Sequence, residues 1–207
     1  MALPTAILIL GPTGSGKTPL GELLEVRGVH GHKARHFDFG SRLRNYAARP
    51  SGILTEEELA VVRASLSSGA LLEDRHFGIA EKLLTGFIAD GLNPATDIII
   101  MNGLPRHTGQ AAALEKLLHI NTIVVLDGTP EIVFERIARD TGGDRRERSD
   151  DELAQVKRRL TIFNERTLPL LDYYESKGRA RIIRLPVGAA TTAEDALKAL
   201  NERLTDF

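Results

Sequence analysis

The sequence contains no cysteine, which excludes disulfides, thiolate metal sites and cysteine nucleophiles. It also lacks an excess of either charge, because 27 Lys and Arg residues are balanced by 28 Asp and Glu residues, giving a net charge of −1. This balance argues against bulk binding to nucleic acid or to a membrane surface. No apolar run approaches the length that spans a membrane, and the first residues lack the basic leader and cleavage site of a signal peptide. A cytoplasmic enzyme or binding protein is expected.

The sequence does have short, fully apolar runs separated by longer stretches with a helical pattern. Its 207 residues are enough for one α/β domain with a sizeable core. Apolar runs predict strands at residues 6–10, 96–101, 121–128 and 180–185, and a weaker strand is predicted within 33–40. Strands that alternate with helices indicate a parallel sheet of about five strands with helices on both faces. We therefore expect a single domain over residues 1–207, without internal repeats or linkers.

The longest helical stretch lies between the weaker strand predicted within 33–40 and the strand predicted at 96–101. Residues 39–90 are too many for a simple crossover, so we predict an inserted helical lobe that closes on a ligand. Two capping-box patterns predict helix starts. Thr55 with Glu58 lies inside the lobe, and Thr191 with Glu194 precedes the last predicted helix.

The segment Gly11-x4-Gly16-Lys17-Thr18 has a strand before it and a helix after it, which is the context of a phosphate-binding P loop. Glycines let the backbone curl so that N–H groups face phosphate oxygens, and the helix N-terminus favours negative charge. In this pattern Lys17 reaches the β- and γ-phosphates of ATP, and the Thr18 hydroxyl ligates Mg²⁺. A chance glycine-rich turn is the alternative, and the loop alone does not separate a kinase from an NTPase switch. The ATP-binding residues predicted in the loop are Gly11, Pro12, Thr13, Gly14, Ser15, Gly16, Lys17 and Thr18.

Arginines are concentrated between residues 136 and 159. Phosphoryl transfer needs no nucleophilic side chain, but it needs two phosphates placed in line, their charge neutralised and water excluded. Guanidinium groups suit this chemistry because they match phosphate oxygens and stay charged. A solvated run of charges is the competing interpretation. The glycines before the cluster, and its place after a strand–helix unit, favour a functional role.

Further segments follow the P loop in a recognisable order. They are Gly103-Leu104-Pro105-Arg106, Gln110 four residues later, Arg148-Ser149-Asp150-Asp151, and Arg159 in the helix that follows. With the P loop, this ordered set resembles the nucleoside monophosphate kinase family over essentially the whole chain, and the adenylate kinases of the short-lid type most closely. The resemblance implies a three-layer α/β P-loop NTPase fold with a helical lobe at about 39–90 that binds the nucleoside monophosphate and a short lid at about 139–150.

The resemblance also implies ATP-dependent phosphoryl transfer to a nucleoside monophosphate, with AMP as the expected acceptor and ATP and Mg²⁺ as cofactors. Arg136 matches the position that stacks on the donor adenine. The implied acceptor-binding residues are Gly40, Arg44, Leu72, Gly103, Arg106 and Gln110. The implied catalytic residues are Lys17, Arg106, Arg139, Arg145, Arg148 and Arg159. The expected partners are small-molecule nucleotides, with neither nucleic acid nor membrane, and a monomer is favoured.

Asn102 departs from the family pattern, in which an aspartate before the glycine helps to hold the magnesium shell. Asparagine can accept a hydrogen bond but brings no charge, so the change predicts weaker Mg²⁺ binding. Asp38 and Asp127 are the first alternative acids, although Asp127 is better explained as a strand-end residue near a helix start. A nucleotide-binding regulatory module with little catalysis is therefore an alternative function.

Two more departures concern the acceptor and the lid. Phe39 stands where a small hydroxyl residue of the family contacts the acceptor base, so a kinase of another small metabolite is a further alternative. In strict register the lid-entry arginine of the family falls on Asp140, and Arg139, one position earlier, can substitute only through a local shift. A zinc-bearing lid is excluded, because the chain has no cysteine and no suitable ligand spacing.

Overall fold

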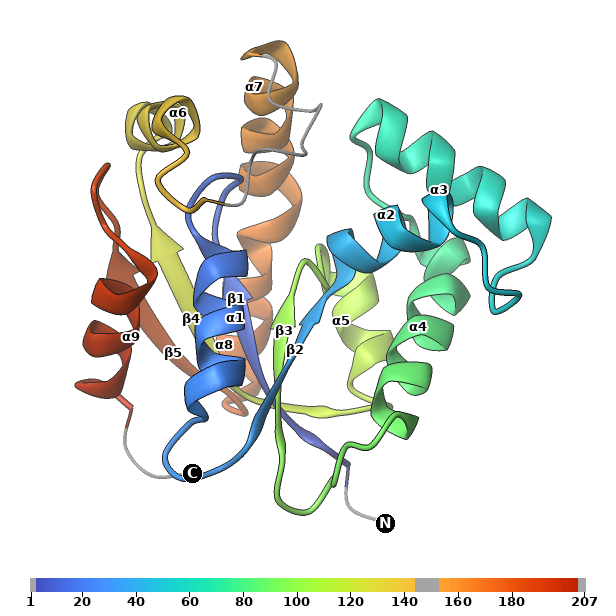
Figure 1. Ribbon diagram of the computed structural model, residues 1–207, viewed down its shortest axis with the longest axis horizontal. Coiled ribbons are helices and arrows are strands. Elements are labelled where there is room, and N and C mark those ends of the chain that lie inside the picture. The colour runs from blue at the N-terminus through green and yellow to red at the C-terminus, as the bar shows by residue number, and fades with distance from the viewer. Residues whose placement is uncertain (1–2, 144–152, 205–207) are drawn as a thin grey trace.

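A computed structural model describes residues 3–143 and 153–204 (Figure 1). Its centre is a five-stranded parallel sheet in the order β2-β3-β1-β4-β5. The strands are β1 (Thr5–Leu10), β2 (Ala34–Asp38), β3 (Ile98–Asn102), β4 (His119–Asp127) and β5 (Arg181–Pro186). All five predicted strands are confirmed. The chain leaves β1 toward β2 on one side and later reaches β4 on the other, so β1 lies at a topological switch point, where ligands bind in open α/β sheets.

Each strand contributes side chains to two cores, because successive side chains of a strand point to opposite faces of the sheet. In β1, Ile7 and Ile9 pack with α1 (Lys17–Arg27) and α9 (Ala193–Asn201). Leu8 and Leu10 belong to a larger core on the other face. That core includes side chains of α2 (Phe39–Ala48), α3 (Glu56–Ser68), α4 (Phe77–Ala89), α5 (Thr108–Leu114) and α8 (Pro169–Lys177). The two cores confirm the predicted three-layer α/β fold class.

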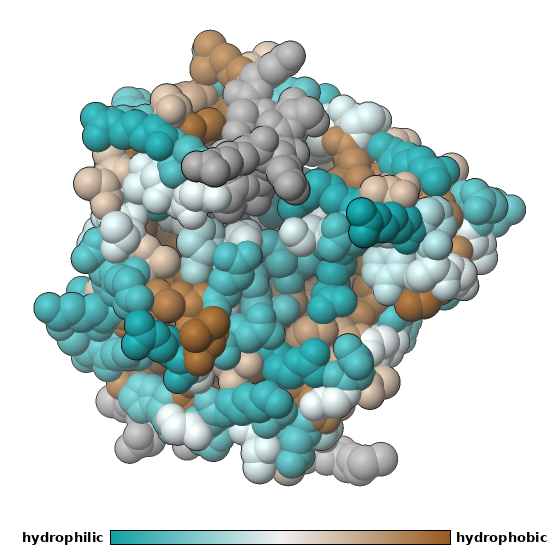
Figure 2. Space-filling view, viewed as in Figure 1, coloured by the Kyte–Doolittle hydropathy of each residue, from teal (hydrophilic) through white to brown (hydrophobic). Residues whose placement is uncertain are grey.

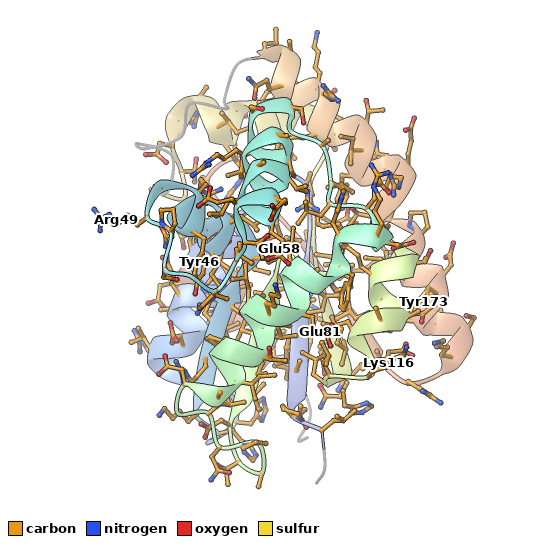
Figure 3. The ribbon with its side chains drawn as sticks, turned by 90° about the vertical axis from the view of Figure 1, so that its right-hand side faces the viewer. Tyr46, Arg49, Glu58, Glu81, Lys116 and Tyr173 are labelled. Carbon is orange, nitrogen blue, oxygen red and sulfur yellow. The ribbon has the colours of Figure 1, made fainter. Side chains whose placement is uncertain are left out.

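The segment between β2 and β3 contains α2, α3, a short 3-10 helix (Asp74–His76) and α4. The predicted capping box of α3 is confirmed, since Thr55 Oγ1 accepts the N–H of Glu58 and the Glu58 carboxylate accepts the N–H of Thr55. The same carboxylate accepts a hydrogen bond from Lys82 Nζ of α4 at 2.7 Å. Figure 3 shows Glu58 where α3 and α4 come together. One glutamate therefore both starts α3 and ties it to its neighbour.

The start of α9 corrects a capping prediction. Thr192 and Asp195 form the capping box, one residue beyond the predicted pair of Thr191 and Glu194. The Thr191 hydroxyl instead accepts a hydrogen bond from the Gly188 N–H at 2.8 Å. Both pairs fit the sequence pattern, but the turn after β5 uses the Thr191 side chain and so leaves the helix start to Thr192.

A wide turn interrupts the helical stretch before β5. Between α7 (Leu153–Ile162) and α8 lies a π-helical turn, Phe163–Thr167, in which the Leu168 N–H donates to the Phe163 carbonyl at 2.9 Å. Pro169 follows directly. A proline lacks the N–H of a regular helix, and its ring clashes with the carbonyl four residues earlier. The wider turn accommodates this ring, and the helix continues as α8.

Few large apolar side chains are exposed. On the face shown in Figure 2, hydrophobic residues are scattered among hydrophilic ones. Within residues 3–143 and 153–204, the exposed large hydrophobic residues are Leu3, Val26, Ile53 and Leu153, which lie on different segments. Within the two described ranges, no helix combines the length and the apolar character needed to cross a membrane. The apolar residues are therefore used mainly inside the two cores.

Substitution of Gly21 tests how closely α1 packs on the sheet. A methyl group at Gly21 would overlap the imidazole ring of His36 on β2, and both residues are buried. We expect Gly21→Ala to lower the free energy of unfolding by roughly 1–3 kcal/mol, because an overpacked site forces its neighbours to move. Chemical denaturation followed by circular dichroism measures this change.

Gly86→Ala on α4 is the matched control. No atom lies within 4 Å of a methyl group at that position, and alanine is favoured over glycine inside a helix by about 0.5–1 kcal/mol. We therefore expect Gly86→Ala to keep or raise stability. Equal losses in the two variants would contradict the close packing of α1 against His36.

Candidate active site

A cavity of about 500 Å³ lies at the carboxyl edge of the sheet. Its walls come from the P loop after β1, the start of α2, the turn after β3, the end of α3 with the segment that follows, and α7 with the π turn. The predicted site residues that line it are Gly11, Thr13, Gly14, Gly16, Lys17, Thr18, Gly40, Arg44, Leu72, Gly103, Arg106, Gln110 and Arg159. The structure thus brings the predicted ATP-binding loop and the predicted acceptor-binding residues to one cavity.

The P loop is curved by its glycines and spanned by its lysine. Gly14 and Gly16 have φ angles of 76° and 100°, which glycine adopts without steric cost. Lys17 Nζ donates hydrogen bonds to the carbonyls of Gly11 at 2.8 Å and Pro12 at 2.6 Å. Gly16 directly precedes α1, so the N-terminus of that helix opens at the cavity. Backbone N–H groups and the helix dipole make such a position suitable for an anion.

Arg136 of α6 (Pro130–Arg139) braces the P loop from outside the cavity. Its side chain is buried, and its Nε donates to the Gly14 carbonyl at 3.0 Å. Its Nη1 donates to the carbonyls of Gly188 and Thr191, both at 2.7 Å. These bonds tie the P loop to the loop after β5. The resemblance assigns Arg136 to stacking on the donor adenine, and that role stays a prediction beside the observed one.

Thr18 belongs to a network with Asp38 and Asn102. The Thr18 hydroxyl donates to Asp38 Oδ2 at 2.7 Å, and Asn102 Nδ2 donates to the same oxygen at 2.9 Å. Asp38 Oδ1 accepts the Ser41 N–H at 2.8 Å and so caps α2. Burial by itself raises the pKa of the Asp38 carboxyl, but the hydrogen bonds from Thr18 and Ser41 help to hold this pKa below its usual value. Asp38 is therefore a carboxylate at neutral pH.

The oxygen atoms of this network fit Mg²⁺, which is commonly bound by one or two carboxylates together with substrate phosphates. Thr18 and Asp38 both line the cavity. Asp127, the other candidate acid, has a side chain that is 60% exposed and lies 3.6 Å from Arg184. It is not among the lining residues. Within the described ranges, no group of three or more His, Cys, Asp or Glu is placed to hold a metal, so a magnesium ion here would also depend on phosphate oxygens.

Arg44, Arg106 and Arg159 give the opposite wall a positive charge. Burial lowers the pKa of Arg106, and the positive charge of Arg159 lowers it further, while Asp38 acts in the other direction. The Nε of Arg106 is buried without a hydrogen-bond partner among the described residues. Arg44 Nη2 donates to Ser41 Oγ at 3.2 Å. Guanidinium groups that have lost water and lie near each other bind a phosphate strongly, because the anion relieves their repulsion.

The backbone of Arg106 is fixed from two sides. Its N–H donates to Gln110 Oε1 at 2.8 Å, and its carbonyl accepts a hydrogen bond from Thr167 Oγ1 at 2.9 Å. Gln110 Nε2 also donates to the Leu72 carbonyl at 2.8 Å. The role of Gln110 in binding the acceptor base stays a prediction. In the structure its side chain links the Leu72 carbonyl to the backbone N–H of Arg106. Thr167 was missed because nothing in the sequence distinguishes it from any helical threonine.

Phe39 is explained by packing. Its side chain is buried in the larger core, and its ring stacks on that of Phe37 with 6.2 Å between the ring centroids. Phe39 also lines the cavity as the first residue of α2. The aromatic ring at this position therefore supports α2 beneath the cavity.

Most of the predicted lid, including Arg145 and Arg148, lies outside the described residues. Arg139 is described and ends α6, with a side chain that is 63% exposed. It forms an ion pair with Glu135 at 2.5 Å, one helical turn earlier. Arg139 is not a lining residue of the cavity. The structure thus places it on the surface of α6 and does not bring it together with Arg106 and Arg159.

The sequence of the chain is similar to a known family model and to several known proteins. A family model described as an AAA domain matches residues 10–157. The chain is 32% identical to the adenylate kinase of Synechococcus sp. (strain WH7803), over 83% of this chain and 85% of the relative. It is 31% identical to the adenylate kinase of Parasynechococcus marenigrum (strain WH8102), over 85% of this chain and 87% of the relative. The adenylate kinase of Xylella fastidiosa (strain M12) is also 31% identical, over 83% of this chain and 86% of the relative.

These matches cover most of each protein, and the family model extends from the P loop past Arg106. The resemblance seen in the ordered motifs is therefore confirmed, and the chain belongs to the nucleoside monophosphate kinase family as an adenylate kinase-like phosphotransferase.

Proposed function

We propose that this protein transfers the γ-phosphoryl group of ATP to AMP, with Mg²⁺ as a cofactor. One observation carries the proposal: a single cavity joins the P loop to the wall formed by Arg44, Arg106 and Arg159. Phosphoryl transfer requires two phosphates placed in line with their charge neutralised. A cavity with one phosphate-binding surface at each end meets that requirement.

On the donor side, the loop N–H groups would bind the phosphates of ATP. The Lys17 ammonium, which donates to the Gly11 and Pro12 carbonyls in the structure, would turn to the β- and γ-phosphates. The Thr18 hydroxyl would hold Mg²⁺ together with phosphate oxygens. When bound, Mg²⁺ neutralises charge on the β- and γ-phosphate oxygens. Arg136 contributes by holding Gly14, and therefore the loop, in place.

On the acceptor side, Arg44 and Arg106 would bind the phosphate of AMP, and Arg159 would contact the transferring group. No side chain has to act as a nucleophile, because an oxygen of the AMP phosphate attacks the γ-phosphorus. The bond from that phosphorus to the β–γ bridging oxygen breaks, one ADP leaves with the bridging oxygen, and the phosphorylated AMP is the second ADP. Burial and the neighbouring Arg159 prepare Arg106 for an anion before it arrives. Closure over the cavity would exclude water and so prevent hydrolysis of ATP.

AMP is the proposed acceptor for two reasons. The relatives described above are named adenylate kinases, and Gln110, the residue that the resemblance assigns to the acceptor base, lines the cavity beside Leu72. A kinase of another small metabolite stays the alternative, since Phe39 lines the cavity where the family has a small hydroxyl residue.

A substrate panel tests the proposal. ADP formation from Mg·ATP is measured with AMP, CMP, UMP, GMP or dTMP, and we expect a large rise with AMP. We expect Arg106→Ala to lower kcat/KM for AMP by roughly 100-fold or more, because it removes a positive charge that would hold the AMP phosphate in line for the transfer. Arg27→Ala is the control, since Arg27 ends α1 and pairs at the surface with Glu194. ATP binding without a rise for any monophosphate would reject the proposal.

Arg136→Met separates the bracing role of Arg136 from its predicted stacking role. Methionine keeps much of the stem but removes the Arg136 donors of the Gly14 and Thr191 carbonyls and one of the two donors of the Gly188 carbonyl, which also accepts the Thr191 N–H. A buried group that is left unsatisfied costs about 1–3 kcal/mol. We expect a lower Tm without nucleotide and weaker ATP binding by calorimetry. Arg184→Met, at an exposed position on β5, should change neither. Weaker ATP binding at an unchanged Tm would support stacking instead.

A further inference from the structure

One carboxylate oxygen receives hydrogen bonds from two neighbouring segments of the site. Asp38 Oδ2, at the end of β2, accepts from Thr18 Oγ1 at 2.7 Å and from Asn102 Nδ2 at 2.9 Å. The parallel register of β2 and β3 pairs Asp38 with Asn102 directly. Thr18 is the P-loop hydroxyl that would hold Mg²⁺. The Asp38 carboxylate therefore lies within hydrogen-bond distance of that hydroxyl.

A helix cap accounts for only one of the two oxygens of Asp38. Oδ1 caps α2 by accepting the Ser41 N–H at 2.8 Å. Asparagine caps helices about as well as aspartate, so the cap requires no negative charge. Oδ2 contacts Thr18 instead, and Asp38 lines the cavity. The negative charge of Asp38 is therefore not needed to cap α2 and has another role.

Asn102 explains why the acid lies on β2. A carboxylate at position 102 would put a second negative charge where Asn102 Nδ2 lies, 2.9 Å from Asp38 Oδ2, and like charges that close oppose each other's ionisation. The amide instead donates to Asp38 and to Thr18, the latter at 3.1 Å. The network therefore contains one acid, and Asn102 holds it in place.

From this geometry we propose that Asp38 is the acid that binds the hydrated Mg²⁺ of the nucleotide complex, and that Asn102 is its positioning residue. The inference rests on the proposed function, because the metal enters with ATP. Mg²⁺ gives up its waters reluctantly, so a carboxylate beside Thr18 can act by accepting hydrogen bonds from them. In the family pattern the negative charge lies at position 102, at the end of β3. Here Asp38, at the end of the neighbouring strand β2, supplies that charge in place of Asn102.

The test is the binding of Mn²⁺ to the protein with a non-hydrolysable ATP analogue, measured by electron paramagnetic resonance without any acceptor. Asp38→Asn keeps the size of the side chain and the cap but removes the charge. We expect it to weaken Mn²⁺ binding by about tenfold or more, the usual effect of losing an outer partner of a metal site, and circular dichroism shows whether the variant stays folded at the temperature of the measurement. Asp127→Asn removes an exposed acid at the end of β4 and should bind Mn²⁺ like the wild type.

A variant that combines Asp38→Asn with Asn102→Asp keeps one acid and one amide on the same two strands. We expect it to recover most of the Mn²⁺ affinity that Asp38→Asn loses. Unchanged affinity in Asp38→Asn would overturn the inference, and so would a double variant that binds Mn²⁺ no better than Asp38→Asn.

ADP formation from ATP and AMP, measured separately on the wild type, keeps the two proposals apart. Activity together with unchanged Mn²⁺ affinity in Asp38→Asn would reject only the role of Asp38. A loss of Mn²⁺ affinity in Asp38→Asn, together with no AMP-dependent activity in the wild type, would reject only the proposed function.

Discussion

The parallel register of three neighbouring strands determines where the groups of the site lie. β3 lies between β1 and β2, and its last residue, Asn102, pairs with Ile9 of β1 and with Asp38 of β2. The P loop begins two residues after Ile9, so Thr18 of α1 returns to the ends of the other two strands. A shift of one residue in either pairing would turn these side chains to the opposite face of the sheet.

Charge is distributed unevenly around the cavity, and Asp38 connects its two ends. Lys17 lies on the donor side, while Arg44, Arg106 and Arg159 lie on the other. Asp38 is hydrogen-bonded to Thr18 and also raises the pKa of Arg106 against the effect of burial. The same carboxylate therefore stabilises the charge of Arg106 and accepts a hydrogen bond from the Thr18 hydroxyl, the proposed ligand of the metal. The positive side chains around the cavity repel one another, which lowers the stability of the protein alone. The negative charge of a bound nucleotide would remove this repulsion.

Local patterns predicted the fold and the P loop well, because they depend on neighbours in the sequence. Apolar runs located four of the five strands, the fifth was predicted more weakly within 33–40, and the spacing of Gly16, Lys17 and Thr18 located the phosphate loop. The capping pair of α9 was placed one residue too early, since Thr191 and Thr192 look alike until the turn at Gly188 is known. The contact between Asp38 and Thr18 depends on strand order, which the sequence does not state. Thr167 could not be predicted either, because its partner, the Arg106 carbonyl, lies far away in the chain.

The π-helical turn before α8 sets the direction of two arginines at once. Thr167, at its end, holds the Arg106 carbonyl, and Arg159 lies one turn of α7 before it. Each residue of a helix turns the chain by about 100°, so the turn acts as a one-residue adjustment between α7 and α8. Shortening Phe163–Thr167 by one residue would rotate Arg159 away from the cavity while Arg106 stayed in place, and it would press the Pro169 ring against the carbonyl four residues earlier. The length of this segment therefore matters to the site as well as its side chains, because it sets the rotation of α7 relative to α8.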